Sequence, residues 1–171
     1  MCYFLYLATP LTLSEVRSML PTGLRADLAP SHAALALRAI DPPAQTVVQI
    51  LSGKCSCDLV RPRLASSRED ERHLRERYRR MKVPRAEVIA SLDRHRVRPQ
   101  RPGTGSMQDG LAAFVSEHAR NAGISLYYLQ FCAEHNEPIQ RLPAAVRTSV
   151  AQVRSAPTSW LAEGLPTFVT R

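Results

Sequence analysis

The chain has 171 residues, a length typical of one globular domain, and a formal net charge of +8. Hydrophobic residues make up 44% and charged residues 22% of the sequence, which excludes disordered, collagen-like and membrane-embedded classes. The apolar run from Cys2 to Ala8 has no cationic residue before it and ends at Thr9-Pro10, so it is too short for a signal peptide or a membrane span. We therefore expect a single-domain cytoplasmic protein over 1–171, without contact to a membrane.

The first part of the chain predicts strands and short helices. In chain order, the patterns indicate a strand over 3–7, helices over 11–20 and 31–40, and two strands over 46–51 and 55–60 joined by a loop that contains Gly53. Ser31 is an expected N-cap, and the prolines at 21 and 42 end the two helices because proline cannot continue a helix.

The second part predicts more helix. Ser66 and Glu69 form a capping-box pattern that opens a helix reaching about Met81, and Pro84 begins another that reaches about His95. A loop over 97–106, a helix over 108–121, a strand over 124–131, a helix over 143–153 and a strand over 165–170 follow. Together these elements predict an α+β fold, in which a mixed β-sheet has helices packed on one face. Residues 61–106 would form an inserted Arg-rich helical hairpin or arm.

The positive charge is confined to one segment. Between Arg61 and Arg101 there are 14 Lys or Arg and 6 Asp or Glu, whereas the other 130 residues hold 9 basic and 9 acidic side chains. Nearly all the cations are Arg, which binds phosphate through two parallel hydrogen bonds better than Lys does. The segment is therefore a candidate surface for a polyanion.

Helical spacing aligns four of these arginines. At 100° per residue, Arg68, Arg72, Arg75 and Arg79 fall on one face of the predicted helix, and Arg94, Arg96 and Arg98 continue the charge beyond the next one. Such a stripe would follow a phosphate backbone and release counterions on binding. The sequence therefore predicts a nucleic-acid-binding surface.

Two observations favour a different interpretation of the same helix. Glu71 with Arg75 and Glu76 with Arg80 are spaced for ion pairs, as in an ordinary solvated helix. Tyr78 is the only aromatic residue in the segment, so bases would find little to stack on. An acidic protein surface is therefore the alternative partner.

The cysteines suggest a second site. Cys55 and Cys57 would point to the same face of a strand, and Cys132 and His135 form a C-x-x-H pair after the last long strand. These four residues are of the types that bind zinc tetrahedrally, and Cys2 would approach the same end of the sheet if its strand is antiparallel to the hairpin. The alternative function is therefore a thiol site, either structural zinc or redox.

Enzyme signatures are absent from the sequence. It contains no P-loop, no dinucleotide-binding glycine pattern, no G-x-S-x-G and no H-E-x-x-H. Cys2 as an N-terminal nucleophile or His118 as a base would be the elements of a small enzyme. The sequence instead favours a non-catalytic binding or regulatory protein, with no cofactor assigned unless zinc binds the thiols.

Overall fold

The computed structural model describes residues 2–41, 43–59, 72, 75–76, 78–97, 104–132, 137–139, 142–157 and 159–171. The chain divides into two compact units, unit 1 (Met1–Arg61 with Gly103–Arg171) and unit 2 (Pro62–Pro102). Unit 1 contains a six-stranded sheet with helices, so the predicted α+β class is confirmed.

The sheet is mixed. Its strands are β1 (Cys2–Thr9), β2 (Arg25–Leu28), β3 (Thr46–Leu51), β4 (Ile124–Cys132), β5 (Val146–Ser149) and β6 (Thr167–Thr170), in the order β2-β3-β1-β4-β6-β5. Only β5 and β6 run parallel, and all other neighbouring strands are antiparallel. Strands β1 and β4 lie at the centre and are apolar along most of their length, as expected where both faces of a sheet are covered.

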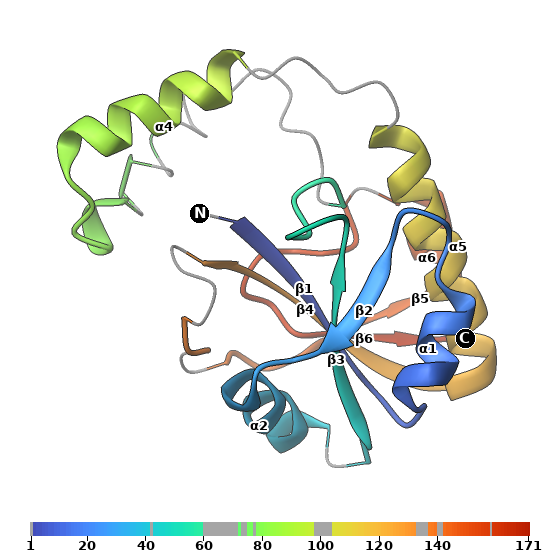
Figure 1. Cartoon of the computed structure of the whole chain (residues 1–171). Helices are drawn as coiled ribbons and strands as arrows, with labels where there is room; N and C mark the ends of the chain where they lie inside the picture. Colours follow the sequence, from blue (N-terminus) through green and yellow to red (C-terminus); the bar gives the residue numbers. More distant parts are fainter. Residues whose placement is uncertain are drawn as a thin grey trace. The chain divides into compact units, whose positions relative to one another are not determined.

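Helices cover both faces of this sheet (Figure 1). They are α1 (Leu13–Met19), α2 (Ser31–Ile40), α5 (Thr104–Ala122) and α6 (Val150–Ser155). Leu5 and Leu7 of β1 face the core that α1, α5 and α6 cover, whereas Phe4 and Tyr6 face the core under α2. The predicted packing on one face therefore holds for three helices, and α2 lies on the opposite face.

The local predictions differ from the structure in four places. Helix α5 begins at Thr104, within the predicted loop over 97–106. The segment 55–59, predicted as a strand, is a series of turns with one isolated bridge. The predicted helix over 143–153 is strand β5 followed by α6, which Ser149 caps by accepting a hydrogen bond from the Gln152 backbone N–H. Strand β2 was not expected, because it is an edge strand of only four residues, too short for its alternation of charged and apolar side chains to stand out.

Unit 2 contains two helical segments joined by a tight turn. Residues 72, 75–76 and 78–80 are helical, and α4 spans Arg85–Val97. Lys82 lies in the left-handed region at φ 53°, and the Val83 N–H donates to the Tyr78 carbonyl at 3.1 Å, which closes the first helix. Tyr78 and Leu92 are buried against each other, so this unit has a small core of its own.

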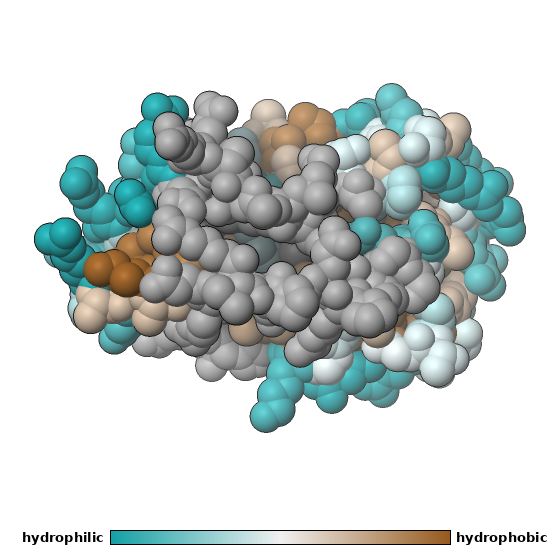
Figure 2. Space-filling model, turned by 90° about the horizontal axis from the view of Figure 1, so that it is seen from above, coloured by the Kyte–Doolittle hydropathy of each residue, from teal (hydrophilic) through white to brown (hydrophobic). Residues whose placement is uncertain are grey.

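The described surface carries few large apolar side chains. Figure 2 shows mainly hydrophilic residues among those coloured, with smaller hydrophobic patches between them. The exposed large apolar residues lie on several different elements: Leu28, Leu35, Ile89, Ile124 and Val146. None of the helices in the described part of the chain is long and apolar enough to cross a membrane.

The hydroxyl of Tyr6 gives a first testable prediction. It is buried and has no hydrogen-bond partner among the described residues, whereas the Tyr127 hydroxyl lies 3.4 Å from His118 Nδ1. Removing a buried hydroxyl that lacks a partner relieves its desolvation cost, so we expect Tyr6→Phe to stabilise unit 1 by about 1 kcal/mol in urea unfolding. The control Tyr127→Phe should destabilise it by about the same amount. A loss of stability in both variants would contradict the prediction.

The buried His118 gives a second prediction, on acid stability. Its Nε2 is hydrogen-bonded to Thr9 Oγ1 at 2.9 Å, its Nδ1 lies 3.2 Å from Ser125 Oγ, and burial lowers its pKa from 6.5 to about 4. Between these two pH values, His118 binds a proton in the unfolded chain but not in the folded chain. The contribution of neutral His118 to the free energy of unfolding is therefore fully present above pH 6.5 and is lost as the pH falls toward 4. The loss should reach about 3 kcal/mol at the acid end.

Urea unfolding at a series of pH values measures this loss. His118→Gln, which cannot titrate, should be less stable at neutral pH but should lose less stability on acidification. An equal acid dependence in the variant and the parent protein would show that other groups are responsible.

Candidate metal centre

Ser56 organises the turn that follows β3. Its hydroxyl donates to the Ile50 carbonyl at 2.5 Å and accepts from the Leu5 N–H at 2.8 Å, and its own N–H donates to the Tyr3 carbonyl at 2.8 Å. These three bonds attach the turn to β1 and β3 just beyond Leu5 and Ile50, where the register between the two strands ends. Cys55 and Cys57, on either side of Ser56, are thereby held near the start of β1.

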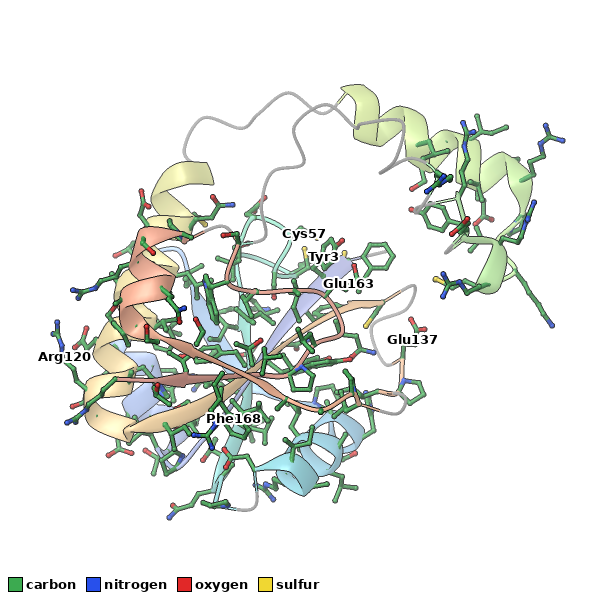
Figure 3. The ribbon with its side chains drawn as sticks, turned by 180° about the vertical axis from the view of Figure 1, so that it is seen from behind. Tyr3, Cys57, Arg120, Glu137, Glu163 and Phe168 are labelled. Atoms are coloured by element: carbon green, nitrogen blue, oxygen red, sulfur yellow. The ribbon has the colours of Figure 1, made fainter. Side chains whose placement is uncertain are left out.

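A second set of contacts shapes the turn itself. The Ser52 N–H donates to the Cys55 carbonyl at 2.8 Å, and Gly53 adopts φ 83°, a conformation that favours glycine. The Tyr3 N–H donates to Cys57 Sγ at 3.3 Å, and Figure 3 shows these two residues side by side at one end of the sheet. The loop therefore has a defined path that points its cysteines toward β1.

Three thiols converge at this place. The Sγ atoms of Cys2, Cys55 and Cys57 all lie within 4.8 Å of one another, and all three residues are partly buried. The cysteines are free, with no disulfide among them. Their spacing allows one metal ion to contact all three sulfurs after small side-chain rotations.

Burial and the nearby thiols raise the pKa values of Cys2 and Cys57. Burial raises the pKa of Cys57 to about 12, and burial followed by the neighbouring Cys55 raises the pKa of Cys2. Three thiolates so close together would repel one another in the absence of a cation. A bound divalent metal reverses this balance, since it stabilises the thiolate and displaces the proton.

The predicted ligands fall into three groups. Cys55 and Cys57 are brought together as expected, and Cys2 joins them. Cys132, at the end of β4, is directly opposite Cys2 in the antiparallel register and is buried, but it does not belong to the group within 4.8 Å. His135 lies outside the described residues.

Cys2 was not one of the four predicted ligands, although it was expected at the same end of the sheet if its strand is antiparallel to the hairpin. The available signal was a cysteine directly before the predicted strand over 3–7. Its approach to Cys55 depends on β1 pairing with β3, and its approach to Cys132 depends on β1 pairing with β4. Neither pairing follows from local patterns.

The predicted arginines lie mostly in unit 2. Arg72, Arg75 and Arg79 are helical and exposed, as are Arg80 and Arg85. Arg94 and Arg96 lie in α4, where the structure describes their backbone only. Arg68 and Arg98 lie outside the described residues. Three of the four arginines predicted to share a helical face are therefore in the conformation that places them there.

In unit 2, both members of one predicted ion pair, Glu76 and Arg80, lie among the described residues. The salt bridges among the described residues join Arg17 and Arg25 to Asp27, all in unit 1. Glu76 and Arg80, spaced for an ion pair, do not form one within 4.0 Å, and both are exposed.

Comparisons with known proteins provide no relative: no protein-family model, no curated protein and no solved structure matches the chain. The functions considered below therefore rest on the residues and their geometry.

Proposed function

We propose that the protein is a non-catalytic metal-binding protein in which Cys2, Cys55 and Cys57 hold a zinc ion. The observation that carries the proposal is the convergence of three free thiols within 4.8 Å from two separate parts of the chain. Thiolates are soft ligands that favour zinc over magnesium or calcium. Four free cysteines also suit a reducing compartment, so we place the protein in the cytoplasm.

The spacing fits a zinc thiolate centre after a small contraction. With zinc–sulfur bonds of about 2.3 Å, the sulfurs of a tetrahedral site lie roughly 3.8 Å apart. All three sulfurs of this cluster lie within 4.8 Å of one another, and rotation about the cysteine χ1 angles can bring them to the shorter spacing. No main-chain rearrangement is required.

Cys132 is the proposed fourth ligand. Residues directly opposite in an antiparallel pair have Cβ atoms about 5 Å apart on the same face, and Cys132 has this relation to Cys2. Cys2 and Cys55 pack against the apolar cluster that contains Cys132. Four thiolates would close the coordination sphere, which is typical of structural rather than catalytic zinc.

Native mass spectrometry tests this proposal. We expect one zinc per chain in protein purified under reducing conditions, with the zinc removed by a chelator and restored by zinc addition. A mass lower by two hydrogens would instead support the redox alternative. Failure to bind zinc under reducing conditions would dismiss the metal site.

A second candidate function concerns unit 2. We propose that its arginines bind nucleic acid, supported by the exposure of Arg72, Arg75 and Arg79 on one helix whose Tyr78 faces the unit's own core. Arginine binds phosphate through its fixed fork of N–H donors. Fluorescence anisotropy with labelled nucleic acid at low salt tests this role, and binding to an acidic protein but to no nucleic acid would overturn it.

A further inference from the structure

We infer that unit 2 recognises double-stranded nucleic acid through its phosphate backbone, in preference to single strands. This inference rests on the proposed nucleic-acid binding and specifies its substrate class. It depends on what unit 2 exposes and on what it buries.

The tyrosine of unit 2, Tyr78, is buried. Tyr78 is the only aromatic residue between Pro62 and Pro102, and its exposed fraction is 0%. Its ring packs with Leu92, and its hydroxyl is hydrogen-bonded to Ser91 Oγ at 2.8 Å. Both the ring and the hydroxyl are thus engaged in joining the first helical segment to α4.

Proteins that bind single strands without sequence preference usually stack bases on exposed aromatic rings. Tyr78, the one Phe, Tyr or Trp residue in the sequence of unit 2, is not free for this purpose, because moving it outward would open the small core. The favourable contacts left to unit 2 are those between arginine and phosphate. We therefore expect the affinity of unit 2 for a nucleic acid to increase with the density of phosphates, and not with the exposure of unpaired bases.

The arrangement of the charges favours a duplex. Arg72 and Arg79 are separated by seven helical positions, or roughly 10 Å along the axis, and Arg75 lies between them on the same side. A duplex carries one negative charge per about 1.7 Å of its axis, about twice the density along one strand. A row of arginines along one helical face gains more from this dense array than from a flexible single strand.

The test compares the full-length protein on labelled duplexes and single strands with equal numbers of phosphates, by fluorescence anisotropy over a range of salt concentrations. DNA and RNA duplexes are separate arms, since both carry the same phosphate chemistry. We expect the duplex to bind about tenfold more tightly than the single strand, and two duplexes of unrelated sequence to bind equally.

The outcomes separate this inference from the proposed function. Equal or tighter binding of single strands, or a strong dependence on base sequence, would overturn the duplex preference while leaving nucleic-acid binding in place. Binding to neither form at low salt would overturn both.

Discussion

Replacing Cys57 by Ser should lower the zinc affinity of the protein at least a hundredfold. A structural zinc site contributes about 10–16 kcal/mol, so each of four thiolates accounts for on the order of 3 kcal/mol, which corresponds to more than a factor of 100. The affinity is measured by competition with a chromophoric chelator of known affinity. Cys2→Ser and Cys55→Ser should also lower the affinity, because each removes one of the three converging sulfurs.

Two controls separate the loss of a ligand from damage to the fold. In the presence of chelator, the parent protein and Cys57→Ser should unfold at nearly the same urea concentration, whereas added zinc should stabilise only the parent protein. Cys132→Ala tests the fourth position: in the cobalt-substituted protein it should reduce the sulfur-to-metal absorption by about a quarter if four thiolates bind. Unchanged zinc affinity in Cys57→Ser would reject the centre.

Replacing Arg72, Arg75 and Arg79 together by Gln should weaken nucleic-acid binding by about one to two orders of magnitude at low salt. Every arginine–phosphate pair contributes about 0.9 to the slope of log affinity against log salt, so the triple variant should have a slope shallower by roughly 2 to 3. Anisotropy titrations at several salt concentrations measure both quantities. The substitutions leave Tyr78 and Leu92 unchanged, so the core of unit 2 should be retained.

The matched control removes the same charge from unit 1. Arg25, Arg120 and Arg147 are exposed on β2, α5 and β5, and their replacement by Gln lowers the net charge by the same amount. If binding depends on the row of arginines in unit 2, this control should retain most of the affinity and slope. Equally weakened binding in the two triple variants would show that only the overall charge matters.

The elements with strong local signals were predicted well. Strand β3 has the predicted bounds of 46–51. Helix α2 covers the predicted 31–40, but Pro30 is its N-cap and the expected N-cap, Ser31, is its first helical residue. Strand β4 extends the prediction by one residue, to Cys132. These segments have apolar runs or clear end signals, including proline, so neighbouring residues are enough to define them.

The missed elements depend on distant partners. Strand β5 (Val146–Ser149) is exposed over half of its length and exists because it pairs in parallel with β6, some twenty residues later. The turn at 55–59 was predicted as a strand from its composition, but the hydroxyl of Ser56 occupies the main-chain groups that would extend the ladder. Local propensity cannot anticipate such tertiary contacts.

The candidate site was predicted in part for the same reason. The proximity of Cys55 and Cys57 follows from their spacing alone. The inclusion of Cys2 follows from the strand order, which places β1 between β3 and β4. For unit 2, the helical spacing of the arginines was readable from the sequence, but the burial of Tyr78 required the packing of α4.

The strand order also determines when each part of the molecule can assemble during synthesis. The ladder between β1 and β4 joins Cys2 to Cys132, so the centre of the sheet cannot close until most of the chain has left the ribosome. Cys2, Cys55 and Cys57, by contrast, all lie within the first third of the chain and need only the pairing of β1 with β3, which spans fewer residues than the pairing of β1 with β4. A metal ion bound at this stage would hold β1 against β3, with the other edge of β1 unpaired, until β4 is synthesised and pairs with it.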